Sequence, residues 1–131
     1  MPKRAITSPN VHEPPGGGNY SQAFEVTGGR TIYVAGMTSR DKDGNTVGKG
    51  DIRVQTKQVL ENMKSVLEAA GGSMSDVVKL TVFITDMSQS GPVREVRQQY
   101  FSKPYPASTL VEISRLADKD FLVEIEAIAV I

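Results

Sequence analysis

Three glutamates near the C-terminus have the side chains and the spacing for acid–base chemistry. Glu124 and Glu126 alternate with apolar residues over 121–131, and Glu112 lies in a similar segment over 107–116. Side chains of a strand alternate between its two faces, so the pattern predicts that the three carboxylates share one face with apolar neighbours. A carboxylate placed there can hold and activate a water molecule. The alternative is that a carboxylate pairs with a lysine or arginine across an interface, or lies at a solvent-exposed edge. We prefer this alternative for Glu112 and Glu126 and leave the choice open for Glu124.

The chain offers few other catalytic side chains. It has no cysteine and a single histidine, His12, in a proline-rich segment. These counts exclude disulfides, thiolate metal sites and a histidine-rich zinc site within one chain. A Ser-His-Asp triad would require His12, which we interpret as an exposed loop residue. Carboxylates, hydroxyls, backbone groups and water remain as the available chemistry.

Two glycine-rich segments have weak similarity to phosphate-binding loops. Residues 44–50 (GNTVGKG) are one residue short of the nucleotide-binding spacing and lack a serine or threonine after Lys49. The triple glycine at 16–18 has no GxGxxG spacing. We interpret both segments as turns.

Size and charge narrow the function class further. The 131 residues predict one domain over 1–131. Fifteen basic residues balance fifteen acidic ones, which argues against a nucleic-acid partner. The longest wholly apolar run, at 127–131, is far shorter than the roughly 20 residues of a membrane span, and no signal peptide is evident. We therefore expect a cytoplasmic protein that acts on a small molecule, away from membranes.

Periodicity predicts the elements that position these residues. Apolar residues recur at helical spacing over about 51–70, with Asp51 as N-cap and glycines at 71–72 as the stop. A second, shorter helix is expected after Gly91-Pro92. The order is β-β-β-α-β-α-β-β, which predicts an α+β fold with a six-stranded mixed sheet and both helices on one face. Alternation predicts the strands over about 3–7, 21–26, 30–37, 78–84, 107–116 and 121–131.

Strand parity leaves one face of the predicted sheet without a helix. Large apolar side chains on that face would form an exposed patch, which usually marks an interface, so we expect a closed homo-oligomer. The alternative is an open sheet with scattered surface hydrophobics. The face under the helices is predicted to carry Ile32, Val34, Val78, Leu80, Val82, Ile84, Val111, Ile113, Val123, Ile125, Ala127 and Ala129. The uncovered face is predicted to carry Tyr33, Met37, Thr81, Phe83, Ser108, Leu110, Glu112, Glu124, Glu126, Ile128 and Val130.

Segments along nearly the whole chain resemble the reactive intermediate deaminase family, also called Rid, YjgF-like or endoribonuclease L-PSP. The resemblance implies a chorismate-mutase-like α+β fold, and a homotrimer whose sheets pack into a central barrel with ligand clefts between subunits. That arrangement agrees with the uncovered face. The matching segments are 19–23 (NYSQA), 31–36 (TIYVAG), 55–63 (QTKQVLENM), 68–71 (EAAG), 76–86 (DVVKLTVFITD), 105–107 (YPA), 111–112 (VE) and 123–130 (VEIEAIAV).

The resemblance also implies an activity. The best-known members hydrolyse reactive enamines and imines, made by pyridoxal-phosphate enzymes, to 2-keto acids and ammonia, and they use no cofactor or metal. By the same resemblance Glu124 is the acid that orients water, Tyr20 is a loop tyrosine over the cleft, and the backbone of Gly36 borders it.

Three positions depart from the family pattern. The substrate-clamping arginine of the family follows a Pro-Ala pair that matches Pro106-Ala107, and here that position is Ser108. A guanidinium holds a carboxylate through two charge-assisted bonds, whereas serine offers one neutral hydroxyl. The loss is expected to weaken binding of a carboxylate-bearing imine by about 10- to 100-fold. Leu110, often cysteine in the family, makes the pocket more apolar. Arg94, often asparagine, could replace the lost cation or lie on the solvated face of its helix, which we prefer.

The sequence therefore predicts an imine or enamine deaminase with altered substrate choice. One alternative is a non-catalytic trimer that binds a small ligand in the same cleft. A ribonuclease is less favoured, because the chain has balanced charge and few aromatic residues.

Overall fold

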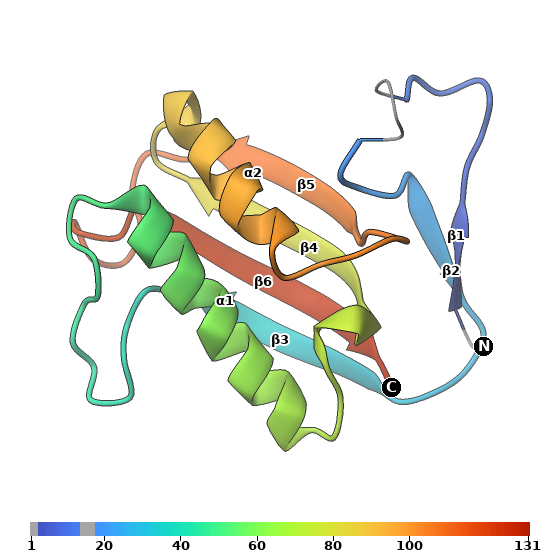
Figure 1. Cartoon of the computed structure of the whole chain (residues 1–131), viewed down its shortest axis with the longest axis horizontal. Coiled ribbons are helices and arrows are strands. Elements are labelled where there is room, and N and C mark those ends of the chain that lie inside the picture. The colour runs from blue at the N-terminus through green and yellow to red at the C-terminus, as the bar shows by residue number, and fades with distance from the viewer. Residues whose placement is uncertain (1–2, 14–17) are drawn as a thin grey trace.

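The computed structural model describes residues 3–13 and 18–131, so most of the predicted 14–18 loop lies outside the described residues. The described chain forms a four-stranded sheet with two helices on one face and a small two-stranded sheet beside it (Figure 1). Neither helix combines the length and the apolar character that a membrane span requires.

Helix α1 (Ile52–Ala69) is the long helix that the periodicity predicts. The Asp51 carboxylate accepts hydrogen bonds from the backbone N–H groups of Arg53 and Val54, which satisfies two donors that the helix leaves free. After the helix, Gly71 adopts a left-handed conformation with φ of +88°, which closes the C-terminus. The stripe that α1 buries against the sheet includes Val59, Leu60, Met63 and Leu67.

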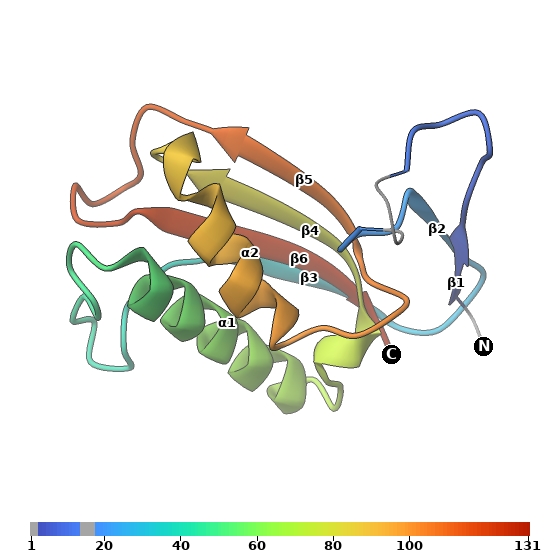
Figure 2. The same ribbon diagram turned by 45° about the horizontal axis from the view of Figure 1, so that its top comes forward.

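Helix α2 (Ser90–Gln98) begins slightly earlier than predicted and holds Pro92 in its first turn, where the missing N–H of proline is not needed. Its buried residues are Val93 and Val96. Figure 2 shows α2 beside α1 across the same face of the sheet. Short 3₁₀ turns at Met74–Asp76 and Met87–Gln89 precede β4 and α2.

The predicted order of six strands is confirmed, but the prediction of one six-stranded sheet is wrong. Strands β3 (Thr31–Met37), β4 (Val77–Ile84), β5 (Ala107–Glu112) and β6 (Val123–Val130) form one sheet in the order β3-β6-β4-β5. It is mixed, because β4 and β5 run parallel while the other pairs are antiparallel. Strands β1 (Lys3–Ile6) and β2 (Ala23–Val26) form a separate antiparallel pair. Strand β2 pairs with β1 rather than with the larger sheet, and a bridge between Ser21 and Ala107 connects the segment before β2 to β5.

The predicted orientation of β5 is also wrong. Leu80 and Val82, buried under the helices, pair with Ser108 and Leu110 of β5. Neighbours across a ladder share a face, so Ser108, Leu110 and Glu112 lie on the helix side of the sheet. Strand β5 is an edge strand with half-exposed side chains on both faces, and its polarity pattern therefore does not reveal which face turns inward.

Register shifts in β3 and β4 place two more residues on a different face of the sheet from the predicted one. Met37 pairs with Ile125 after a break in the β3–β6 ladder and packs against the core, not on the uncovered face. A similar shift in β4 places Val77, rather than Val78, in the core cluster. One extra residue in a strand reverses the face of the residues beyond it, which alternation alone does not predict.

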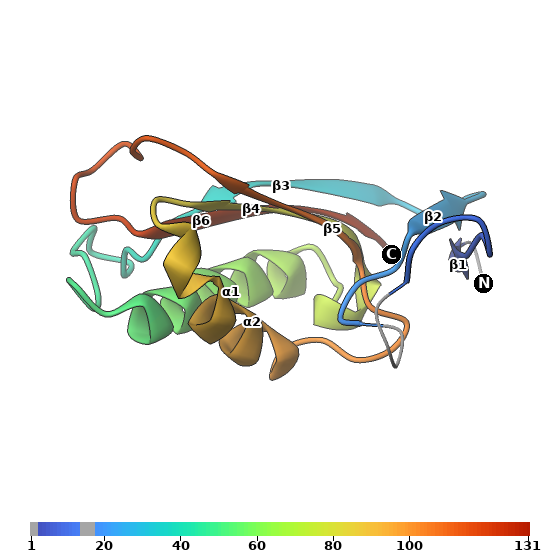
Figure 3. The same ribbon diagram turned by 90° about the horizontal axis from the view of Figure 1, so that it is seen from above.

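One face of the four-stranded sheet carries no helix, as predicted. Figure 3 shows both helices on the opposite side. Tyr33 on this face is 78% exposed, although it is a large aromatic side chain. We call this surface the uncovered face; by register it includes Tyr33, Thr81, Phe83, Val111, Glu124 and Ile128.

Candidate functional site

A cavity of about 120 Å³ lies between α2 and β5, beside Ser108. The structure therefore brings together three of the predicted site residues, Ser108, Leu110 and Arg94. It adds two residues that the sequence analysis missed, Asn19 and Arg97. The lining includes Asn19, Val93, Arg94, Arg97, Ser108 and Leu110.

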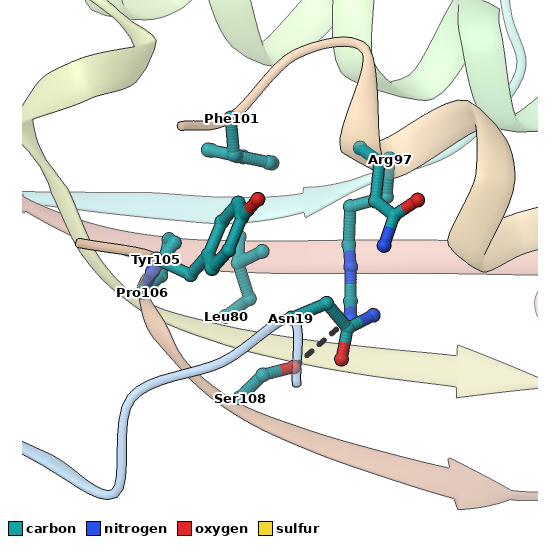
Figure 4. A pocket seen from close by; sticks show the side chains of 8 residues that line it. Asn19, Leu80, Arg97, Phe101, Tyr105, Pro106 and Ser108 are labelled. Atoms are coloured by element: carbon teal, nitrogen blue, oxygen red, sulfur yellow. Dashed lines mark hydrogen bonds between the residues drawn. The ribbon is translucent and has the colours of Figure 1, made fainter. Parts of the chain in front are cut away.

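Arg97 reaches from α2 across to β5. Its Nη1 atom donates a hydrogen bond to the Ser108 hydroxyl oxygen at 3.0 Å (Figure 4). A neighbouring pocket shares Asn19, Arg97 and Ser108 with this cavity. The rest of its lining is mostly apolar and includes Leu80, Phe101, Tyr105 and Pro106. The signal that could have identified Arg97 is its spacing, because it lies four residues after the buried Val93 and so shares that side of the helix.

The positive charge in this cavity has no acidic partner within the described chain. Burial, and then the nearby charge of Arg94, lower the pKa of Arg97 from its ordinary value. A guanidinium stays protonated in proteins, so Arg97 still carries its charge. No ion pair found within residues 3–13 and 18–131 includes Arg94 or Arg97. The cavity therefore presents two uncompensated cations.

Asn19 adds an unused donor to the same cavity. Its side-chain nitrogen is buried and has no hydrogen-bond partner in the described chain. Buried polar groups are normally satisfied, so a free amide beside a guanidinium calls for an acceptor from outside the chain.

Glu124 lies elsewhere, on the uncovered face. It pairs with Phe83 across the β4–β6 ladder and is half-buried. Its carboxylate packs against Gly36, where a Cβ atom built on the glycine would come within 2.7 Å of the carboxyl carbon. Within the described chain, none of the side-chain hydrogen bonds or ion pairs found includes the Glu124 carboxylate. The half-buried carboxylate therefore packs against Gly36 and keeps its oxygens available to water.

Glu124 and Ser108 are separated within one chain. They lie on opposite faces of the sheet, and β4 stands between their strands. A single chain thus carries two separate candidate half-sites, one with Arg97 and Ser108 and one with Glu124 and Gly36.

Tyr20 lies in a third place. It lines a separate pocket of about 380 Å³ together with Gln22, Lys103 and Tyr105. Its loop is anchored at the start of β5, because the backbone N–H of Ser21 donates to the carbonyl of Pro106 at 3.1 Å. Asn19, next to Tyr20 in sequence, is the loop residue that reaches the Ser108 cavity.

The remaining candidates are peripheral. Glu112 accepts a hydrogen bond from the backbone N–H of Met87 at 2.8 Å, so it serves as a structural acceptor. Glu126 and His12 are exposed. Residues 44–50 form turns and loops, and no group of three histidine, cysteine or acidic residues in the described chain is arranged to hold a metal.

Comparison with known proteins identifies relatives along the whole chain. A model of the family described as Endoribonuclease L-PSP matches residues 11–131. A RutC family protein of Pyrococcus horikoshii is 46% identical over 127 residues, which cover 97% of each chain. A 2-iminobutanoate/2-iminopropanoate deaminase of Dermatophagoides farinae is 39% identical over 130 residues, which cover 99% of this chain and 98% of that one.

Solved structures agree with the sequence matches. The crystal structure of YyfB from Yersinia pestis, a protein of unknown function in the conserved Rid family, superposes with a TM-score of 0.88 and 32% identity. That match covers 100% of both chains. The chain therefore belongs to the Rid (YjgF-like) family, which is the endoribonuclease L-PSP family of the matching model.

Proposed function

We propose that this protein hydrolyses imines, and the enamines in equilibrium with them, to carbonyl compounds and ammonia. The observation that carries the proposal is the carboxylate of Glu124, which is half-buried, packed against Gly36 and free of any hydrogen bond or ion pair found in the described chain. The deaminase name of the relative from Dermatophagoides farinae supports the same reaction class.

The reaction needs only the groups that the chain supplies. Glu124 takes a proton from a water molecule as the water oxygen bonds to the imine carbon. That proton passes to the nitrogen, which gives the neutral carbinolamine. Glu124 then takes the proton of the new hydroxyl group and delivers it to the amino nitrogen, so the C–N bond breaks and ammonia leaves as the C=O bond forms. One water is consumed and one ammonia released, so the step is balanced without an oxidant or reductant.

We further propose that the working site lies between subunits of a homotrimer. The two half-sites face opposite sides of one sheet, so a substrate that touches both must bridge two chains. The exposed Tyr33 and its apolar neighbours on the uncovered face provide a surface for that assembly. In this arrangement Glu124 of one chain acts on a substrate that lies in the cavity of Ser108 and Leu110 of the next.

Replacing Glu124 by glutamine tests the proposal. Imines are generated in the assay from amino acids by an amino-acid oxidase, and ammonia release is followed with and without the protein. Loss of general acid–base catalysis is expected to lower the enzymatic rate by about 10²-fold or more. Glu126→Gln, two residues along on the same face but exposed, is the matched control and should retain the wild-type rate. The proposal fails if wild type matches the rate without enzyme across a broad panel of amino acids, or if Glu124→Gln matches wild type.

The description of the matching family model names an endoribonuclease, but we do not extend that activity to this chain. Fifteen basic and fifteen acidic residues leave no net charge to attract a polyanion. A ligand that raises the melting temperature of the wild type without being turned over would indicate the non-catalytic binder instead.

A further inference from the structure

We propose that Arg97 is the substrate-binding guanidinium of this protein, and that from α2 it performs the task that the family assigns to an arginine at position 108. This inference rests on the proposed function for its substrate, a 2-imino acid. It revises the expectation that Ser108 weakens the binding of a carboxylate-bearing imine.

The small side chain at position 108 leaves room for the Arg97 guanidinium beside it. The Ser108 hydroxyl lies 3.0 Å from Nη1 of Arg97, so an arginine side chain at 108 would extend into space next to a guanidinium that is already there. A second cation there would also meet the positive charge of Arg97. The small hydroxyl instead accepts a hydrogen bond from Arg97 and orients it (Figure 4).

The donors around this position call for an anion. A guanidinium has five N–H groups, and the hydrogen bonds found in the described chain use Arg97 once, toward Ser108. The buried amide nitrogen of Asn19 lines the same cavity and has no partner. A carboxylate can accept from both groups at once, and charge-assisted bonds of this kind are about twice as strong as neutral ones. An uncharged ligand would leave the half-buried cation uncompensated.

The remaining lining limits the rest of the ligand. Val93 and Leu110 are apolar, and the cavity of about 120 Å³ admits only a small group. Arg94 is exposed, so solvent and salt screen its charge more strongly than that of Arg97. The geometry therefore points to a small ligand with one carboxylate, which under the proposed function is the carboxylate of the imine substrate.

Binding of product analogues tests this role without requiring turnover. Pyruvate and its methyl ester, which lacks the charge, are titrated into the wild-type protein by isothermal calorimetry. Wild type is expected to bind pyruvate and to discriminate against the ester. Arg97→Gln should lose about 10- to 100-fold in affinity for pyruvate and most of the discrimination.

Two further variants separate binding from folding. Arg53→Gln removes an arginine that pairs with Glu95 outside the cavity, and it should bind pyruvate as wild type does. The exchange Arg97→Ser with Ser108→Arg moves the guanidinium back to the family position. It is expected to recover pyruvate binding that Arg97→Ser alone loses, which a merely structural role for Arg97 does not predict.

Each outcome has a distinct meaning. Wild-type affinity in Arg97→Gln, or equal binding of pyruvate and its ester by wild type, overturns the assignment of Arg97. Pyruvate binding that depends on Arg97, in a protein that releases no ammonia, contradicts the proposed function and supports the anion site. Ammonia release that is insensitive to Arg97→Gln supports the deaminase and overturns this inference.

Discussion

The carboxylate of Glu124 occupies the space beside Gly36 that any other side chain at position 36 would enter. A Cβ atom built on Gly36 would lie 3.0 Å from Cγ of Glu124 and closer still to the carboxyl group. The glycine is therefore required for the position of the acid. The backbone conformation of Gly36 does not itself require glycine, because its φ is not positive.

Gly36→Ala is expected to displace the Glu124 carboxylate and lower kcat for imine hydrolysis. A displacement of about 1 Å in a catalytic group can cost about 10²-fold. The fold should survive, because the atoms that must move are the end of a flexible side chain. Gly91→Ala is the control, since its added methyl group would meet no heavy atom within 4 Å. Wild-type kcat in Gly36→Ala would show that the position of Glu124 is not critical.

Tyr33→Glu is expected to dissociate the proposed trimer. The substitution places a carboxylate at the most exposed large aromatic position of the uncovered face, where assembly would have to bury it. Light scattering coupled to gel filtration should give the mass of three 14.2-kDa chains for wild type and of one chain for the variant. Val54→Glu, at an exposed position of α1, should leave the mass unchanged. A wild-type monomer would contradict the assembled site.

Gln55→Leu is expected to destabilise the fold. The fully buried Gln55 amide donates to the carbonyl groups of Gly48 at 3.1 Å and Asp120 at 2.8 Å, and accepts from the N–H of Leu122 at 2.8 Å. Leucine would leave buried backbone groups unsatisfied, at a cost of about 1–3 kcal/mol or more in the free energy of unfolding. Urea denaturation measures this change, and Gln99→Leu at an exposed position is the control. Equal midpoints for Gln55→Leu and wild type would refute the prediction.

Tyr100 is expected to make stability depend on pH in the alkaline range. Burial first, and then its hydrogen bond with Glu61 and the charge of that residue, raise the pKa of Tyr100 to about 12 from 10.0. Because the folded pKa is raised, this contribution to stability is complete below pH 10 and is lost as pH rises towards 12. Absorbance near the tyrosinate band, compared between wild type and Tyr100→Phe, reports the titration. Between pH 10 and 12 the free energy of unfolding should fall more steeply with pH for wild type than for Tyr100→Phe. Equal slopes for the two proteins would contradict the assignment.

The sequence by itself determined the helices, the order of the strands and the family. Helix α1 was predictable because its apolar stripe spans 18 residues and both ends carry local signals, the Asp51 cap and the Gly71 stop. The position of Glu124 on the uncovered face was also predictable, since β6 alternates between buried and less buried residues from Val123 to Ala129. These features depend on interactions within one element or on a regular period.

The tertiary structure alone decided which face of β5 turns inward and which cation lies at Ser108. Strand β5 is half-exposed on both faces at the edge of the sheet, so only its pairing with Leu80 and Val82 reveals its orientation. Once Ser108 faces the helices, α2 brings Arg97 within 3.0 Å of its hydroxyl, whereas Arg94, one turn earlier, lies at the exposed rim. The distance between two elements depends on how they pack, and helix–sheet packing is set by the whole core rather than by the residues of either segment.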